Sequence, residues 1–214
     1  MSHNQTRALS LAVAKGYIWD ETEAFLKQLG WCFDTDLSKS RQLWTFEKER
    51  NIKVLLVRSW DVPTYVAEGA VDIGIVGKDV LIEQDPDVVE LLDLGYGACE
   101  LVIAALAALS LKQMPPYQKV ATKYINSTKA YFKEQGLLVQ PIKLSGAIEL
   151  APITGISDMI CDLTATGTTL RENGLTIIDS VFRSTARLIA NPISMRSFYD
   201  KISDLVEKFS QHHS

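Results

Sequence analysis

The 214-residue sequence is poor in the residues that would indicate a disulfide scaffold or a metal centre. It has three cysteines, Cys32, Cys99 and Cys161, which lie far apart and form no C-x-x-C pair. We therefore expect neither a disulfide framework nor a structural zinc site, and we interpret all three as reduced, mostly buried thiols. His212 and His213 lie in a polar tail without a third ligand, and His3 lies near the N-terminus, so no metal site is predicted there.

Long hydrophobic runs and an excess of positive charge are missing as well. The longest apolar stretch, residues 101–109, is far shorter than the roughly 20 residues that span a bilayer. Residues 9–14 are too few for a signal-peptide core and run directly into Lys15. We therefore expect a cytoplasmic protein without membrane contact. The formal net charge of −4 argues against non-specific nucleic-acid binding, but it leaves room for a local cationic pocket that binds an anionic small molecule.

The composition that remains is that of an ordinary globular protein, with 47% apolar and 22% charged residues. Short β-branched runs alternate with helical segments, which predicts an α/β fold of two lobes with largely parallel sheets. No linker rich in Pro, Gly or Ser separates the lobes. We therefore expect strands that cross between the lobes and a cleft for a small ligand in the crossing region.

Hydrophobic periodicity and turn residues predict the individual elements. Strands are expected over residues 8–14, 52–57, 72–76, 99–106, 119–122, 138–144 and 159–163. Helices are expected over residues 19–29, 127–135 and 194–209, and from residues 78 and 168 onward, with an irregular segment over 108–116. Asp61 is expected to cap a further helix that has Pro63 in its first turn and ends before Gly69.

The most informative segment is CDLTATGTTL, residues 161–170. A buried strand delivers Asp162, which can accept hydrogen bonds from sugar hydroxyls. Small and hydroxyl-bearing residues around Gly167 then lead into a helix. Small residues let the backbone approach a ligand, and the N–H groups at a helix start favour an anion. The side chains that can add donors to phosphate oxygens are those of Thr164, Thr166, Thr168 and Thr169.

This loop is not a Walker phosphate loop, because no lysine follows its last glycine. Its order of acid, small residues and Thr-Gly-x-Thr resembles the loop of phosphoribosyltransferases that binds phosphoribosyl diphosphate (PRPP). Taken alone, the loop is equally compatible with an ordinary strand-turn-helix junction capped by threonine.

Further segments widen the resemblance. They are RSWDVPTYV (58–66), DIGIVGKDVL (72–81), VATKY (120–124), IKLSGAIELAP (142–152) and RLIAN (187–191). In this order, and with the threonine loop in its place, they resemble ATP phosphoribosyltransferase, the first enzyme of histidine biosynthesis. The resemblance runs over residues 9–209. The length of the chain is similar to that of the family's short form, which lacks a C-terminal regulatory domain.

The resemblance implies the two-lobed fold of type II periplasmic binding proteins, with a cleft between the lobes. Lobe I would comprise residues 1–97 and 184–214, with the ATP side and dimer contacts, and lobe II would comprise residues 98–183, with the PRPP loop. It also implies a homodimer that joins a regulatory subunit resembling histidyl-tRNA synthetase in a hetero-oligomer.

The implied reaction transfers the phosphoribosyl group of PRPP to N1 of ATP and releases diphosphate. Mg²⁺ would shield the diphosphate, mostly through water and substrate oxygens, so no all-protein metal site is expected. Two other interpretations stay open. The first is a two-lobed protein that binds nucleotide or PRPP without turnover, including an inactive paralogue. The second is a structural or interaction module. The structural module would leave Arg58, Asp162 and the threonine loop unexplained.

The resemblance also implies the site residues. Lys15, Arg41 and Arg58 would be the catalytic cations. The guanidinium groups of the two arginines suit this role, because each can donate two hydrogen bonds to two oxygens of one phosphate. ATP would be bound by Lys15, Gly16, Tyr17, Arg41 and Arg58. PRPP would be bound by Glu149, Asp162, Thr164, Ala165, Thr166, Gly167, Thr168 and Thr169. From position alone, Arg41 and Arg58 are also compatible with solvated surface charges, and Glu149 is also compatible with an acid that the helix dipole favours at a helix start.

Two positions depart from the family pattern. The family usually has Lys-Gly-Arg where this chain has Lys15-Gly16-Tyr17, and Tyr17 can donate one hydrogen bond but carries no charge. Either another cation substitutes or turnover is lowered. Ala165 stands where related loops often carry Ser, Glu or Asp, which removes one polar contact.

Overall fold

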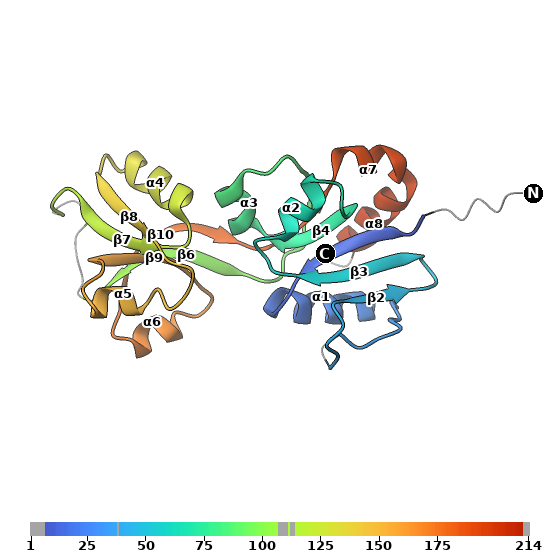
Figure 1. Ribbon diagram of the computed structural model, residues 1–214, viewed down its shortest axis with the longest axis horizontal. Helices are drawn as coiled ribbons and strands as arrows, with labels where there is room; N and C mark the ends of the chain where they lie inside the picture. Colours follow the sequence, from blue (N-terminus) through green and yellow to red (C-terminus); the bar gives the residue numbers. More distant parts are fainter. Residues whose placement is uncertain (1–6, 38, 107–110, 112–113, 212–214) are drawn as a thin grey trace, which may run out of the picture. The chain divides into compact units, whose positions relative to one another are not determined.

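The computed structural model describes residues 7–37, 39–106, 111 and 114–211. The chain forms two compact units (Figure 1). The first unit comprises Met1–Leu81, Asp85–Gly97 and Thr185–Ser214, and the second comprises Ile82–Gln84 and Ala98–Ser184. The first unit is therefore assembled from both ends of the chain, while the second is almost continuous in sequence.

The first unit is built on a six-stranded sheet with the order β2-β3-β1-β4-β11-β5. Its strands are β1 (Leu9–Ala14), β2 (Trp44–Glu47), β3 (Ile52–Val57), β4 (Ile73–Gly77), β5 (Val89–Asp93) and β11 (Ala186–Ala190). β1 is parallel to β3 and β4, whereas β2 is antiparallel to β3, and β11 is antiparallel to β4 and β5. The prediction of largely parallel sheets was wrong, because sequence periodicity carries no information on strand direction.

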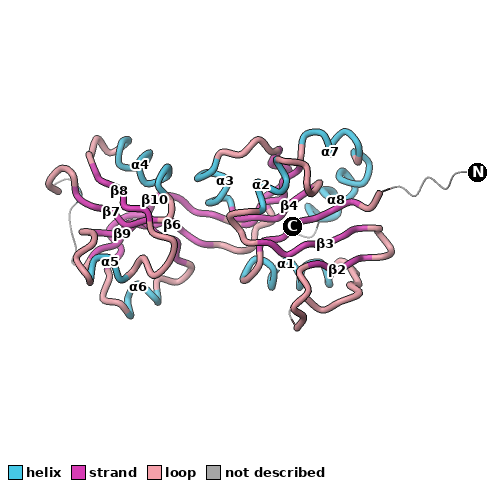
Figure 2. The backbone as a smooth tube through the Cα atoms, in the orientation of Figure 1, coloured by secondary structure: helices cyan, strands magenta, loops and turns pink. Residues whose placement is uncertain are grey.

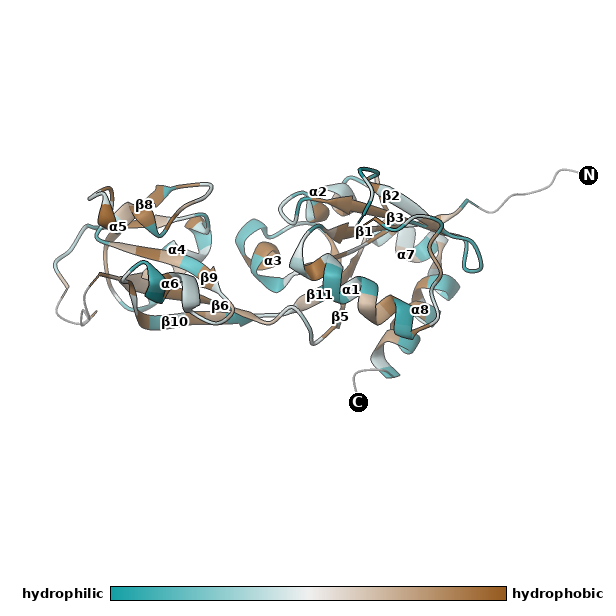
Figure 3. Cartoon of the chain, turned by 90° about the horizontal axis from the view of Figure 1, so that it is seen from below, coloured by the Kyte–Doolittle hydropathy of each residue, from teal (hydrophilic) through white to brown (hydrophobic). Residues whose placement is uncertain are grey.

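Helices cover both faces of this sheet. They are α1 (Tyr17–Gln28), α2 (Val62–Ala67), α3 (Lys78–Gln84), α7 (Pro192–Ser197) and α8 (Tyr199–Gln211). All six side chains of β1 are buried, and because they alternate between faces they enter two different cores. Leu11 and Val13 pack with residues of α1 and α8, and Ala12 and Ala14 pack with residues of α2 and α3. In Figure 3 the apolar colours concentrate on the strands, while α8 carries hydrophilic segments.

The C-terminal helical segment differs from the single helix predicted over residues 194–209. α7 begins at Pro192, and the Asn191 side chain caps it by accepting hydrogen bonds from the N–H groups of Ile193 and Ser194 at 2.8 and 3.1 Å. Phe198 leaves the helical conformation, with φ −125° and ψ 28°, and its ring packs against the core. The segment is therefore two helices, which the apolar period alone did not reveal.

The second unit is built on a five-stranded sheet with the order β10-β6-β9-β7-β8 (Figure 2). Its elements are β6 (Cys99–Ala105), β7 (Gln118–Thr122), α4 (Ile125–Glu134), β8 (Val139–Lys143), α5 (Leu150–Ile153), β9 (Met159–Thr164), α6 (Thr168–Glu172) and β10 (Thr176–Ser184). β7 is parallel to β8 and β9, and β6 is antiparallel to β9 and β10. This sheet is mixed as well.

The predictions for Asp61, the cysteines and the histidines have different outcomes. Asp61 stands at the N-cap of α2, but its side chain makes no capping hydrogen bond. Only Cys161 is buried, whereas Cys99 is half-buried and Cys32 is exposed, so the prediction of mostly buried thiols was wrong. His3, His212, His213 and most of the predicted loop over 108–116 lie outside the described residues. Within the described part of the chain, no helix is long and apolar enough to cross a membrane.

Candidate active site

The first unit gathers its predicted cations at one edge of its sheet. β1 and β3 are parallel and in register, with Ala14 opposite Val57, and the Lys15 N–H donates to the Val57 carbonyl at 2.8 Å. Lys15 and Arg58 each follow the last residue of their strand. Because carboxyl ends of parallel strands share an edge, these two residues are neighbours there.

Arg41 reaches the same edge from the other direction. β2 is antiparallel to β3, so the segment that precedes β2 lies beside the carboxyl end of β3. The Leu56 N–H donates to the Leu43 carbonyl at 2.7 Å, which fixes this placement. Lys15, Arg41 and Arg58 are all exposed, and among the described residues none of them forms an ion pair. Three such cations at one edge favour a polyanionic ligand.

The start of α1 completes this edge. Gly16 has φ 99°, a conformation suited to glycine, and it stands at the N-cap of the 12-residue helix without a side-chain capping bond. N–H groups of the first helical turn have no intrahelical partner, and the helix dipole favours an anion beside them. Tyr17, the first residue of the helix, is 61% exposed. The five residues predicted for the ATP site thus share one edge of the sheet.

The second unit brings three loops together in the same manner. β7 is parallel to both β8 and β9, with Thr122 opposite Lys143 and opposite Cys161. The segments that follow these strands therefore meet at one edge. They contain Lys123, residues 144–149 and residues 165–167. Ala147 in the second segment has φ 48°, an unusual value for a residue other than glycine and one that concentrates at functional sites.

The threonine loop has a defined hydrogen-bonded structure. Gly167 has φ 70°, and its N–H donates to Thr164 Oγ1 at 2.7 Å. The conformation favours glycine, and a Cβ at this position would lie 3.2 Å from Nη1 of Arg171, a tight contact with the end of that side chain. The hydroxyls of Thr166 and Thr168 lie 2.9 Å apart. The loop is therefore ordered by its own side chains.

Asp162 lies at this edge in an unusual electrostatic environment. The pKa of its carboxyl is raised from 3.8 to about 6, and burial is the largest cause. A hydrogen bond of 2.9 Å from the Leu163 N–H lowers this pKa. The Glu149 carboxylate raises it further, and the Lys123 ammonium lowers it. Glu149, at the N-cap of α5, is thus within electrostatic reach of Asp162. At neutral pH the Asp162 carboxylate is ionised and can accept hydrogen bonds from hydroxyl groups.

Two cations at this edge were not predicted as site residues. Lys123 follows β7, and its place in the matched segment VATKY was the signal that could have found it. Arg171, on α6, donates from Nη1 to the Thr166 carbonyl at 3.2 Å and from Nη2 to Thr168 Oγ1 at 3.1 Å. Its spacing of three and five residues from these threonines was the only sequence signal.

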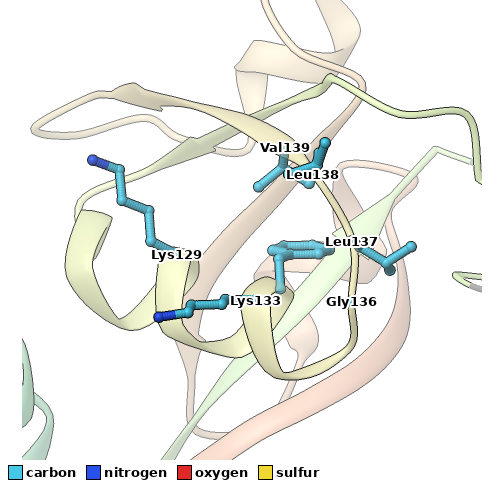
Figure 4. Close-up of a pocket in the computed structure, with 7 residues that line it drawn as sticks. Lys129, Lys133, Gly136, Leu137, Leu138 and Val139 are labelled. Carbon is cyan, nitrogen blue, oxygen red and sulfur yellow. The ribbon is translucent and has the colours of Figure 1, made fainter.

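A pocket of about 330 Å³ in the second unit lies elsewhere (Figure 4). It is lined by Lys129, Phe132, Lys133, Gly136, Leu137, Leu138 and Val139. These residues belong to α4, to the turn that follows it and to the first residue of β8, whereas the threonine loop follows the carboxyl end of the parallel strand β9. The pocket is therefore at the opposite edge of the sheet from the candidate site.

The chain is similar to known proteins over most of its length. The family model described as ATP phosphoribosyltransferase matches residues 58–211. The ATP phosphoribosyltransferase of Geobacillus sp. (strain WCH70) is 41% identical over 203 residues, which cover 95% of this chain and 98% of that protein. The one from Halalkalibacterium halodurans is 43% identical over 204 residues, which cover 95% of each.

Solved structures extend the comparison to the fold. A chain of the ATP phosphoribosyl transferase (HisG:HisZ) complex from Thermotoga maritima has a TM-score of 0.80 and 33% identity, covering 96% of this chain and 100% of that one. The periplasmic aliphatic sulphonate binding protein SsuA from Escherichia coli, at 16% identity and a TM-score of 0.61, shares the fold alone and covers 96% of this chain and 72% of that one. The fold is the two-lobed α/β fold of type II periplasmic binding proteins, and the chain belongs to the ATP phosphoribosyltransferase family.

Proposed function

We propose that this chain transfers the phosphoribosyl group of PRPP to N1 of ATP, releases diphosphate and so performs the first step of histidine biosynthesis. The observation that carries this proposal is the similarity, over almost the whole chain, to proteins named ATP phosphoribosyltransferase. The threonine loop beside Asp162 and the cationic edge of the first unit supply side chains suited to that chemistry.

PRPP binds to the second unit in this proposal. The loop of Thr164, Ala165, Thr166, Gly167, Thr168 and Thr169 holds its phosphate oxygens through hydroxyl and backbone N–H donors, while the Gly167 N–H donates to Thr164 Oγ1 and orders the turn. The carboxylates of Asp162 and Glu149 accept hydrogen bonds from the ribose hydroxyls. The ordered loop and the electrostatic coupling of the two carboxylates support this assignment.

ATP binds through Lys15, Gly16, Tyr17, Arg41 and Arg58. N1 of the adenine attacks the anomeric carbon of PRPP, and the bond from that carbon to the diphosphate oxygen breaks. Positive charge develops on the ribose and negative charge on the departing diphosphate. Lys15, Arg41 and Arg58 stabilise the departing charge, which is how fixed cations lower such a barrier.

Mg²⁺ enters with the substrate in this proposal, and it neutralises charge on the diphosphate. Among the described residues, no group of three or more His, Cys, Asp or Glu side chains could hold a metal ion. Mg²⁺ commonly binds through water, substrate phosphates and one or two carboxylates, a pattern that fits this donor set. Asp162 and Glu149 are the carboxylates that this proposal places in the PRPP site.

We further propose a cytoplasmic homodimer that assembles with a regulatory subunit. The Thermotoga maritima relative is named as part of a HisG:HisZ complex, which supports a second type of chain. The alternative, binding of PRPP or nucleotide without turnover, rests on Tyr17 and is not favoured by the extent of the similarity.

The test mixes the purified chain with ATP, PRPP and Mg²⁺ and follows the N1-phosphoribosyl adduct by ultraviolet absorbance. We expect product from the wild type and none from Asp162→Ala or Arg41→Ala. A wild type that binds PRPP in calorimetry but gives no product, alone or with the regulatory subunit of a relative, would favour the binding protein. Absence of both binding and product would overturn the proposal.

A further inference from the structure

Arg171 is a cation whose guanidinium is engaged by the threonine loop rather than by a carboxylate. Among the described residues it forms no ion pair, and its two side-chain hydrogen bonds go to Thr166 and Thr168. We propose that Arg171 is a positioning residue for PRPP, which sets the backbone and the hydroxyl directions of the loop for an anionic ligand. This inference rests on the proposed function, because it presumes that the loop binds PRPP.

The first part of the argument concerns the backbone. The Arg171 Nη1 group donates to the Thr166 carbonyl at 3.2 Å, and the Arg171 N–H donates to the Gly167 carbonyl at 3.1 Å. A carbonyl oxygen directed at a phosphate would repel it. The backbone bond is the ordinary helix bond that any residue except proline makes at this position. The side chain of Arg171 adds the restraint on the Thr166 carbonyl and keeps its negative end away from the ligand. The Gly167 N–H is held by Thr164 Oγ1 at 2.7 Å, so the turn is fixed from both sides.

The second part concerns the hydroxyl hydrogens. Thr166 Oγ1 and Thr168 Oγ1 lie 2.9 Å apart and share one hydrogen bond. Arg171 Nη2 donates to Thr168 Oγ1 at 3.1 Å, and a guanidinium has no acceptor to offer in return. Neither hydroxyl has another acceptor among the described residues. One of the two hydroxyl hydrogens is therefore unused, whichever threonine donates to the other, and it is available to a phosphate oxygen.

The third part concerns charge. The guanidinium is always charged, and without a carboxylate partner among the described residues no negative charge offsets it beside the loop. An uncharged side chain with both donors and acceptors, such as glutamine, would remove this charge and could also accept a hydroxyl hydrogen. Lysine would keep the charge, but its donors lie on a single nitrogen and could not hold the carbonyl and the hydroxyl in one planar arrangement.

A purely structural role makes a different prediction. Arg171 lies in the last turn of α6, where a cation is favoured by the helix dipole. On that view its loss would lower the melting temperature and affect both substrates alike. The positioning role predicts instead a selective loss of PRPP affinity.

The experiment compares steady-state kinetics of the wild type with Arg171→Gln and Arg171→Lys, with Lys133→Gln as the charge-matched control. Lys133 is an exposed cation in the last turn of α4, at the opposite edge of the sheet. We expect Arg171→Gln to raise the KM for PRPP about tenfold or more, because charged hydrogen bonds are lost, with less than about a twofold change in the KM for ATP. Arg171→Lys should recover part of the loss, and Lys133→Gln should match the wild type.

A double-mutant cycle tests the route through the hydroxyl. The Kd for PRPP is measured by calorimetry for Thr168→Val, for Arg171→Gln and for the double variant. The fold-increase in Kd of the double variant should be smaller than the two single fold-increases multiplied together, because both changes remove the same interaction. A wild-type KM for PRPP in Arg171→Gln, or an equal rise in both KM values, would overturn the role of Arg171 alone. A wild type that neither binds PRPP nor forms product would overturn the proposed function and this role with it.

Discussion

Ser194 Oγ in α7 donates a hydrogen bond of 2.7 Å to Asp72, which immediately precedes β4 and lies 122 residues earlier in the chain. The same buried carboxylate accepts bonds from the N–H and the hydroxyl of Ser10 in β1 at 2.9 and 2.7 Å, and it pairs with Arg7. One acid thus joins the first strand, the central strand and the C-terminal helices of the first unit.

Asp72→Ala should therefore strongly destabilise the protein. The change leaves the buried N–H of Ser10 without its acceptor, and we expect a loss of about 2–4 kcal/mol in the free energy of unfolding, measured by urea denaturation. The matched control is Asp204→Ala, which breaks an exposed pair with Lys208 on α8 and should cost less than about 1 kcal/mol. Equal effects of the two changes would contradict the anchoring role of Asp72.

Gly74 of β4 predicts a second stability effect. A Cβ there would lie 2.8 Å from Val62 Cγ1, 2.9 Å from Val66 Cγ2 and 3.2 Å from Ile189 Cγ1, so α2 must shift to admit it. Gly74→Ala should cost about 1–3 kcal/mol through overpacking, again by urea denaturation. Gly146→Ala is the control, because no atom of the described residues lies within 4 Å of its added methyl group. A neutral Gly74→Ala would show that α2 moves freely.

Asp162 predicts a pH-dependent stability. Its pKa in the folded protein, about 6, is above the ordinary 3.8, so the folded state holds this proton more tightly than the unfolded chain does. Stability should therefore fall as the pH rises from about 4 to about 6, by about 1–2 kcal/mol after allowance for partial solvent exposure. The free energy of unfolding of Asp162→Asn should not show this fall. The stability of the variant relative to the wild type should therefore increase between pH 4 and 7.5. If the difference in free energy of unfolding between the wild type and Asp162→Asn did not change with pH, the raised pKa would be contradicted.

The same group predicts a pH dependence of activity. If the ionised Asp162 carboxylate accepts the ribose hydroxyls, kcat/KM for PRPP should rise as the pH passes through about 6. The phosphates of the substrates also ionise in this pH region. The informative quantity is therefore the difference between the pH profiles of kcat/KM for the wild type and for Asp162→Asn. An identical acid limb in both proteins would assign it to the substrates.

Tyr17 predicts a gain of function. Tyr17→Arg places a charge at the exposed start of α1, beside Lys15 and Gly16, and should raise kcat about tenfold if the departing diphosphate lacks a cation there. Tyr17→Phe is the control for the hydroxyl. An unchanged Tyr17→Arg together with a slower Tyr17→Phe would show that the hydroxyl suffices.

Much of the fold follows from the sequence where apolar runs are buried. The strands predicted over 52–57 and 159–163 match β3 and β9 to within one residue, because their side chains face a core. β10 was missed because most of its residues are at least partly exposed and two register irregularities break its alternation. β2 and β5 are short edge strands with equally weak patterns.

The candidate site was predictable to a similar extent. The threonine loop was found because an acid, small residues and a glycine stand where a buried strand ends. Arg171 and Lys123 were missed because their contacts depend on how α6 folds back over the loop and on which strands are neighbours. Gly167 was an indirect signal for Arg171, because an added Cβ at residue 167 would come within 3.2 Å of Nη1 of Arg171.

The position of β11 sets an order on synthesis. This strand lies between β4 and β5, yet it is made after all of residues 98–184. While the chain leaves the ribosome, the second unit already has every strand of its sheet, whereas β4 and β5 still have unpaired edges where Ala186–Ala190 will insert. The first unit is therefore the first to be started and the last whose sheet can be completed. Until β11 is synthesised, the unpaired edges of β4 and β5 must be kept from pairing with other nascent chains.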